Sequence, residues 1–251
     1  QDKPLGTAHA VYCAKESLEG NVIVAFADTL FKANFVLDSE ADGVIWVKHV
    51  DDPRSFGVVK VNDQNVITEF IEHPKTPVSN LAIIGIYYFK QGEVLRDEIK
   101  YLIDNNIIAN GEYQLTVALE NMRNKNTKFK TASVDSWMDC GNKDATVKTN
   151  QRVLDSLNKD ELISKSAEIR NSVVVDPCYI GENVIIENSV VGPHVSIGND
   201  TKIYNSLLRN SIIQTNSVIE TLSIENSMVG NYVQIKGEVS HINVGDYTQL
   251  S

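Results

Sequence analysis

Apolar residues follow two different periods along the chain, and the change falls near Ser166. Up to about Leu157, short continuous apolar runs alternate with stretches whose apolar residues recur at helical spacing. That alternation is typical of an α/β domain. Beyond Ser166, aliphatic residues recur every five or six positions, a spacing that neither a helix nor a simple hairpin has. We therefore predict two domains, residues 1–157 and residues 158–251.

The first part contains candidate strands and helices in alternation. Residues 21–27 form a continuous apolar run, which predicts a strand buried on both faces. Two runs that flank the polar turn at residues 62–65 predict a hairpin. Val147, Leu154 and Leu157 share one stripe of the last helical pattern. The other predicted strands are 43–47, 56–61, 66–71, 81–89 and 129–134, and the predicted helices are 93–105, 112–124 and 143–157.

The second part has the pattern of a left-handed parallel β-helix. Glycine follows the aliphatic residue at several steps, as in hexapeptide repeats. Three steps would form one triangular coil, in which each aliphatic side chain stacks inside the prism on its counterpart one coil away. The residues predicted to point inward are Ile169, Val175, Ile180, Ile186, Val191, Ile197, Ile203, Leu208, Ile213, Ile219, Ile224, Val229 and Ile235, and the glycine steps are Gly181, Gly192, Gly198, Gly230 and Gly245.

Charge and cysteine content narrow the possible partners and compartment. The chain has 33 Asp and Glu residues against 23 Lys and Arg, for a formal net charge of -10, and no basic block. This argues against a nucleic-acid partner or an anionic membrane. The three cysteines are far apart and form no CxxC pair, which favours a reducing compartment, and we expect a cytoplasmic protein.

Two aspartates follow strand-like segments. Asp28 comes directly after the run at residues 21–27, and Asp139 lies between the predicted strand at 129–134 and the helix after Asn142. Ligands of open parallel sheets bind at the carboxyl ends of strands. Because Mg²⁺ prefers one or two carboxylates together with phosphate oxygens, the pair would suit a nucleoside triphosphate. Alternatively, Asp28 caps a turn or a helix starting near Phe31, and Asp139 is a turn residue.

Seven segments then occur in the order seen in sugar-1-phosphate nucleotidyltransferases. Over residues 1–157 the chain most resembles glucose-1-phosphate thymidylyltransferases and uridylyltransferases, several of which also end in a left-handed β-helix. The resemblance implies a Rossmann-like nucleotidyltransferase domain, incomplete at its N-terminus, before the β-helix. The segments are QDKPLGTAHA (1–10), AD (27–28), FGVV (56–59), EHP (72–74), SNLA (79–82) with Gly85, GEYQLT (111–116) and WMDCGN (137–142).

The resemblance implies a reaction and a set of site residues. A sugar-1-phosphate oxygen would attack the α-phosphate of a nucleoside triphosphate, and pyrophosphate would leave. Asp28 and Asp139 would be catalytic and would hold Mg²⁺. Gln1 and Gly6 would hold the base, and a side-chain amide suits the imide edge of uracil or thymine, so dTTP or UTP is favoured. The residues that would approach the sugar are Gly57, Glu72, Asn80, Gly85 and Glu112.

Structural interpretations stand beside these roles. Gly57 and Gly85 alternatively relieve crowding in strands, Glu72 is a surface residue, and Glu112 occupies the first turn of a helix. We assign the β-helix to self-association or to positioning, and we expect a homo-oligomer with no nucleic-acid or membrane partner.

The pattern also departs from the family. The glycine-rich loop with its Arg and Lys, expected near the N-terminus, is not in the sequence, so we expect residues to precede Gln1. Ala27 replaces a glycine, His73 a lysine and Val117 an aspartate. Two other functions remain open: a hexapeptide-repeat acyltransferase that uses His194 or His241 as general base, and a non-catalytic regulatory or assembly subunit of the same fold.

Overall fold

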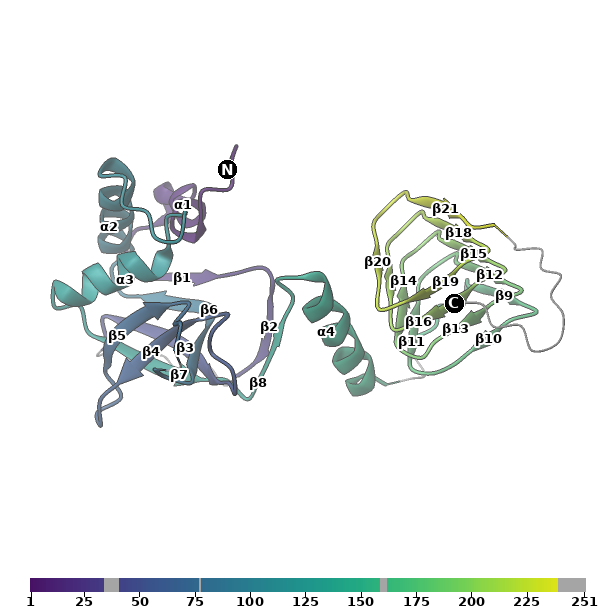
Figure 1. Cartoon of the computed structure of the whole chain (residues 1–251), viewed down its shortest axis with the longest axis horizontal. Helices are drawn as coiled ribbons and strands as arrows, with labels where there is room; N and C mark the ends of the chain where they lie inside the picture. The colour runs from purple at the N-terminus through teal and green to yellow at the C-terminus, as the bar shows by residue number, and fades with distance from the viewer. Residues whose placement is uncertain (34–40, 77, 159–161, 239–251) are drawn as a thin grey trace, which may run out of the picture. The chain divides into compact units, whose positions relative to one another are not determined.

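The computed structural model describes residues 1–33, 41–76, 78–158 and 162–238 (Figure 1). They belong to two compact units, Gln1–Met138 and Asp139–Ser251. Within these ranges, no helix has the length and apolar character needed to cross a membrane.

The first unit is built on a mixed sheet of six strands. Its order is β5-β4-β6-β3-β7, and β1 pairs with β6 outside this path. The pair β3–β7 is parallel, whereas β1, β3 and β4 are antiparallel to β6 and β5 is antiparallel to β4. All six predicted strands are therefore confirmed, as β1 (Val22–Ala25), β3 (Gly43–His49), β4 (Gly57–Val61), β5 (Ile67–Glu72), β6 (Leu81–Phe89) and β7 (Phe129–Ser133).

Side chains on the two faces of this sheet enter two separate cores. One face packs against α1 (Thr7–Tyr12), α2 (Gly92–Asp104) and α3 (Leu115–Asn124), which all lie on the same side of the sheet in Figure 1. The other face packs with residues from β2 (Thr29–Lys32) and β8 (Ser136–Asp139), which pair with each other. A short 3₁₀ helix, Lys15–Ser17, follows α1.

Three local predictions are wrong. β1 is half-buried rather than buried on both faces, with Ile23 58% exposed, because its side chains alternate and only Val22 and Val24 reach the helix core. Residues after Asp28 form strand β2 instead of a helix near Phe31. Leu157 leaves the stripe of α4 (Lys143–Ser156), because it adopts an extended backbone at the C-cap and is exposed.

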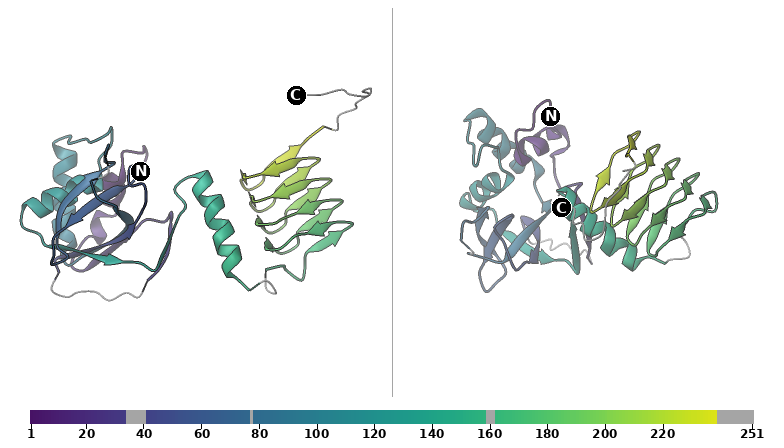
Figure 2. Two further views of the ribbon diagram at one scale, coloured as in Figure 1. Left: turned by 60° about the horizontal axis from the view of Figure 1, so that its bottom comes forward. Right: turned by 45° about the vertical axis from the view of Figure 1, so that its right-hand side comes forward.

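The second unit is a parallel β-helix of about four turns, consistent with the predicted left-handed β-helix. Figure 2 shows its coils stacked in chain order. Partners in neighbouring coils lie 17 or 16 residues apart, as in Ile185 with Lys202 and Lys202 with Val218. The first sheet contains β10 (Val173–Val174), β13 (Val190–Val191), β16 (Leu207–Arg209) and β19 (Ser223–Glu225). The second contains β11 (Cys178–Ile180), β14 (Val195–Ile197), β17 (Ile212–Ile213) and β20 (Met228–Val229). The third contains β9 (Glu168–Arg170), β12 (Ile185–Glu187), β15 (Lys202–Tyr204), β18 (Val218–Glu220) and β21 (Gln234–Lys236).

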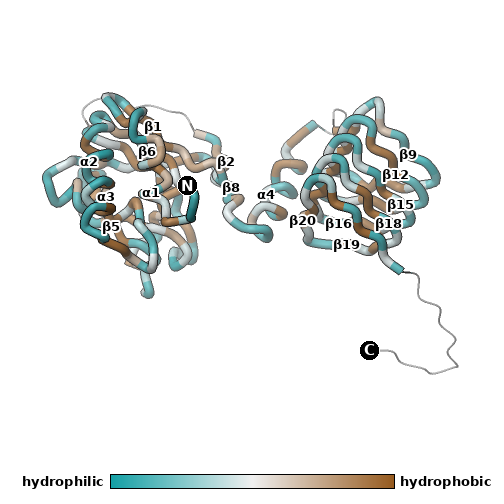
Figure 3. Tube along the Cα trace, turned by 90° about the horizontal axis from the view of Figure 1, so that it is seen from above, coloured by the Kyte–Doolittle hydropathy of each residue, from teal (hydrophilic) through white to brown (hydrophobic). Residues whose placement is uncertain are grey.

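Most of the predicted inward residues fill the prism. Figure 3 shows apolar residues alternating with polar ones along each coil. Val174 packs inside in place of Val175, because Val174 is the residue in register with Val191 and Leu208. Ile169 and Ile235 have the predicted register but lie in the end coils of the described stack, and they are 40% and 37% exposed. Gly245 and His241 lie outside the described residues.

Helix α4 belongs to the unit of the β-helix. The division between the units falls after Met138, so Asp139 and α4 are grouped with the coils. The domain boundary that we placed between residues 157 and 158 from the sequence stays a prediction.

Neighbouring leucines on β16 test the stacking of the coils. Leu208 is fully buried, whereas Leu207 is 48% exposed. We expect Leu208→Ala to lower the free energy of unfolding of the β-helix by about 2–5 kcal/mol, because it leaves a cavity between coils. Leu207→Ala should change it by less than about 0.5 kcal/mol, as surface substitutions usually do. Equal losses in urea unfolding would contradict the assigned inward face.

Candidate active site

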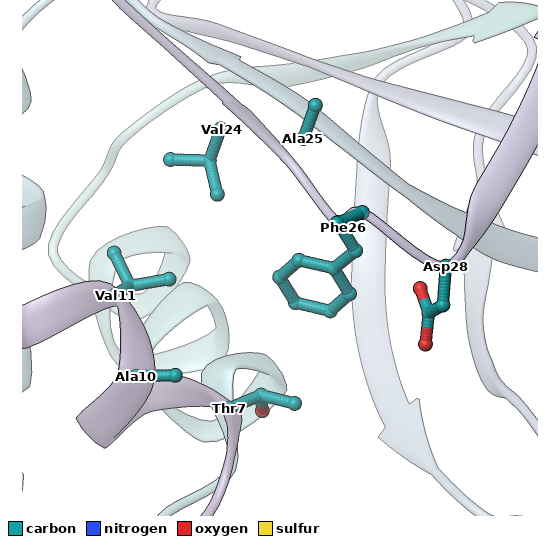
Figure 4. A pocket seen from close by; sticks show the side chains of 8 residues that line it. Thr7, Ala10, Val11, Val24, Ala25, Phe26 and Asp28 are labelled. Carbon is teal, nitrogen blue, oxygen red and sulfur yellow. The ribbon is translucent and has the colours of Figure 1, made fainter. Parts of the chain in front are cut away.

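A pocket of about 520 Å³ lies between α1 and the end of β1 in the first unit. Thr7, Ala10 and Val11 line it from the helix, and residues 24–28 line it from the strand. Figure 4 shows Val11, Val24 and Phe26 around the pocket and the Asp28 carboxylate beside Phe26. The walls are thus mostly apolar, with a carboxylate at one end, an arrangement common in small-molecule sites.

Gln1 and Gly6 lie together at the start of α1. The Gln1 amide Nε2 donates to Gly6 O at 3.2 Å and lies 2.9 Å from His9 Nδ1. Gly6 has φ +108°, and an added Cβ would lie 2.6 Å from Tyr113 O and 2.8 Å from Glu112 Cβ. Only glycine fits here without displacing the backbone. The fold therefore brings Glu112 next to Gly6, although more than a hundred residues separate them.

Glu112 precedes α3 instead of lying in its first turn. The helix begins at Leu115, three residues later than predicted, because Gln114 has an extended backbone. Glu112 Oε2 accepts a hydrogen bond of 3.4 Å from Gln114 Nε2. The interpretation that Glu112 occupies the first turn of a helix is therefore wrong.

Glu72 is held in place by its neighbours. It lies opposite Gly57 in the β4–β5 pair, and the Thr116 hydroxyl donates to its Oε2 at 2.6 Å. An added Cβ at Gly57 would lie 3.0 Å from that oxygen. His73 Nε2 lies 3.1 Å from the other oxygen, and the Glu72 side chain is only 17% exposed. The interpretation of Glu72 as a surface residue is therefore wrong. At position 73, where the family pattern has a lysine, this chain has a histidine whose imidazole lies beside Glu72.

Gly85 lies on β6, where the ring of Phe26 covers it. Its φ is +81°, and an added Cβ would lie 3.1 Å from two Phe26 carbons. Phe26 N also donates to Gly85 O at 2.9 Å. This contact supports the interpretation that Gly85 relieves crowding. Asn80 lies just before β6, and its backbone oxygen accepts a hydrogen bond of 2.9 Å from Val50 N.

Tyr87 is a candidate residue that the sequence did not single out. Burial raises the pKa of its hydroxyl, and the negative charges of Glu72 and Asp28 raise that pKa further. The buried phenol therefore stays neutral near two of the predicted site carboxylates. Within an apolar run such as residues 81–89, a tyrosine resembles a core residue. Its place two residues after Gly85, on the same face of the strand, was the available signal.

The two aspartates of the predicted magnesium site belong to different units. Asp28 is exposed, and its Oδ1 lies 3.5 Å from the Thr29 hydroxyl. Asp139 is half-buried, and its Oδ1 accepts from Gly141 N at 2.9 Å, as in a turn. Across the described ranges, no three His, Cys, Asp or Glu side chains gather to hold a metal. Shared coordination by Asp28 and Asp139 stays a prediction.

Comparison with known proteins decides the family. A model of the nucleotidyl transferase family matches residues 1–156. The chain belongs to the nucleotidyl transferase family. The glucose-1-phosphate thymidylyltransferase of Streptomyces griseus is 28% identical over 99% of the chain and 77% of its own length. The low-salt glycan biosynthesis nucleotidyltransferase Agl11 of Haloferax volcanii is 29% identical over 100% and 77%. The bifunctional protein GlmU of Methanocaldococcus jannaschii is 30% identical over 93% and 54%.

Family membership bears on the two other functions. A nucleotidyl transferase is an enzyme, which favours catalysis over a purely regulatory or assembly subunit. His194 lies against α4, with Nε2 at 2.8 Å from Asp155 Oδ1 and a side chain only 17% exposed. This contact supports a structural role for His194 in this nucleotidyl transferase and not that of a general base for acyl transfer.

The buried phenol predicts a change in alkaline stability. The pKa of Tyr87 is raised above its ordinary value of 10.0, so the unfolded chain loses this proton at lower pH than the folded chain does. The contribution of neutral Tyr87 to the free energy of unfolding is complete below pH 10.0, the ordinary pKa, and is lost as the pH rises toward the folded-state pKa. Above about pH 10, we expect the free energy of unfolding to fall less steeply with pH in Tyr87→Phe than in the wild type. The difference between the two slopes should be about 1.4 kcal/mol per pH unit.

Urea unfolding at a series of alkaline pH values measures this slope. Tyr232→Phe is the control, because it removes a phenol that is 77% exposed. A slope that is the same in Tyr87→Phe and the wild type would show that Tyr87 ionises alike in both states.

Proposed function

We propose that this nucleotidyl transferase joins a nucleoside triphosphate to a sugar-1-phosphate, giving a nucleoside diphosphate sugar and pyrophosphate. We favour dTTP or UTP and glucose-1-phosphate. The observation that carries the proposal is the alignment of the S. griseus glucose-1-phosphate thymidylyltransferase with 99% of the chain, through both units.

The geometry around Glu72 supports a sugar site. The Thr116 hydroxyl fixes one carboxylate oxygen, and Gly57 leaves bare backbone beside it. A carboxylate held in this way accepts hydrogen bonds from sugar hydroxyls without losing rotamer freedom on binding. Tyr87 is buried on β6, and the charge of Glu72 helps to keep its hydroxyl neutral. Asn80 and Glu112 complete the proposed sugar-binding set, together with Gly85, whose place in it rests on the family resemblance alone.

The pocket between α1 and β1 supports a nucleotide site. Its apolar walls suit the faces of a base ring, and Gln1 and Gly6 lie where α1 begins. The Gln1 amide offers a donor and an acceptor together, which matches the imide edge of uracil or thymine. We assign the triphosphate to the end of the pocket that Asp28 lines.

The carboxylates Asp28 and Asp139 fit a hard divalent cation. Both are oxygen donors, and Gly141 N donates to one of the two carboxylate oxygens of Asp139, Oδ1. Mg²⁺ needs only one or two such ligands when substrate phosphates supply the rest. When bound, the ion would offset the negative charge of the phosphates. The two aspartates would orient the triphosphate, and the Glu72 cluster would orient the sugar.

Self-association through the β-helix is part of the proposal. Val173, Val190 and Leu207 point outward in register along three coils, and they are 56%, 38% and 48% exposed. An apolar strip of this kind is a candidate surface for a second copy of the chain.

Pyrophosphate release tests the function. We expect the protein, mixed with Mg²⁺, glucose-1-phosphate and dTTP or UTP, to release pyrophosphate. Asp28→Ala and Asp139→Ala should each lower this rate by roughly 10²–10³-fold, because charge on the transferring phosphate is no longer offset. The control is Asp63→Ala, which removes an exposed turn carboxylate. Full activity in both site variants would refute the assignment of the two aspartates.

A further inference from the structure

The segment that carries Asp139 is shaped by α4. Thr149 is buried, and its hydroxyl donates to the backbone oxygen of Asp139 at 2.7 Å. The hydroxyl of Thr146 donates to Cys140 O at 3.0 Å. Asn142 caps the helix by accepting from Ala145 N at 3.0 Å. The first two turns of α4 therefore fix the backbone of residues 139–142, so any shift of this helix shifts Asp139.

The same helix is fastened to the β-helix at three levels. Lys143 Nζ donates to Asn226 O at 3.1 Å. Asn150, next to Thr149, accepts from the Ser196 hydroxyl at 2.6 Å and donates to His194 O at 3.3 Å. Near the end of α4, Asp155 lies 2.8 Å from the His194 ring. The contacts span residues 143–155, about 18 Å of helix, so they restrain both its rotation and its sliding.

His194 occupies a corner of the prism where asparagine stands in the following coils. The register of β14, β17 and β20 makes Asn210 and Asn226 the equivalents of His194 in the next two coils. All three residues have positive φ, which is +61° at His194. Asparagine adopts this conformation at little cost and histidine adopts it less readily. Asn210 bonds to Asn226 at 2.6 Å along the column, whereas the longer His194 side chain reaches across to α4.

We propose that His194 and Ser196 are positioning residues for Asp139, acting through α4. The β-helix then has a role in the active site besides self-association: it sets where one of the two metal-binding carboxylates lies. This inference rests on the proposed function, because it assigns metal binding to Asp139. Residues that hold a metal ligand in place without touching the metal typically contribute about 10–100-fold to metal affinity or activity.

The test uses the full chain with His194→Asn, which keeps a residue suited to the corner, and Ser196→Ala, which removes one hydroxyl. Mn²⁺ binding in the presence of dTTP or UTP, followed by electron paramagnetic resonance, should weaken roughly tenfold in the double variant. Hydrogen exchange of the amides of residues 139–156 should become faster, with the inner coils unchanged. The KM for Mg²⁺ should rise while kcat at saturating Mg²⁺ changes little.

Two controls make the result specific. Ser223→Ala removes an exposed hydroxyl from another sheet of the prism and should leave all three measurements unchanged. Asp155→Ala should reproduce His194→Asn, and combining the two should add no further loss, because they remove the same contact.

The outcomes separate the two proposals. Unchanged Mn²⁺ affinity and unchanged exchange of residues 139–142 in the double variant would overturn the positioning role while leaving pyrophosphate release by the wild type intact. No pyrophosphate from the wild type would instead defeat the proposed function. The exchange measurement needs no substrate, so it still shows in that case whether His194 and Ser196 hold the Asp139 segment.

Discussion

Strand β6 is the element on which the first unit depends, because its two faces belong to two different cores. Ile83, Tyr87 and Phe89 pack with the helices, whereas Ile84, Ile86 and Tyr88 pack on the opposite side. The strand also receives β1, β3 and β4 as neighbours. A strand with so many constraints has a fixed register. That register puts Tyr87 on the helix side of the sheet, where burial and the charges of Glu72 and Asp28 raise the pKa of its hydroxyl.

In the second unit, α4 packs on the β-helix although its residues belong to the part of the chain that matches the nucleotidyl transferase family. The family match extends to residue 156, and α4 ends at Ser156. Even so, the polar side chains Asn150 and Asp155 bond to coil residues. An array of coils is stiff because every backbone step is repeated in register by its neighbour. It therefore offers α4 a rigid support that a loop would not provide.

The periodic parts of the molecule could be predicted from the sequence, and the close contacts could not. Burial repeats itself in strands and coils, so the apolar runs located β3, β6 and nearly every inward residue of the prism. Val175 was misplaced because two adjacent valines satisfy the same spacing, and only pairing with Val191 shows that Val174 points inward. The neighbours of Glu72 and Gly6, Thr116 and Glu112, are distant in sequence, and no local pattern encodes them. Tyr87 was missed because it lies within an apolar strand, where a tyrosine resembles a core residue.

The coil spacing of 17 or 16 residues has a consequence for how such a chain tolerates length changes. A whole coil added after Asn226 would lengthen the prism and leave every contact of α4 intact. The same insertion between Ser196 and Asn226 would move the partner of Lys143 away from that of Asn150 by one layer, about 4.8 Å. Insertion of a coil is therefore compatible with the α4 contacts after Asn226 and incompatible with them between Ser196 and Asn226.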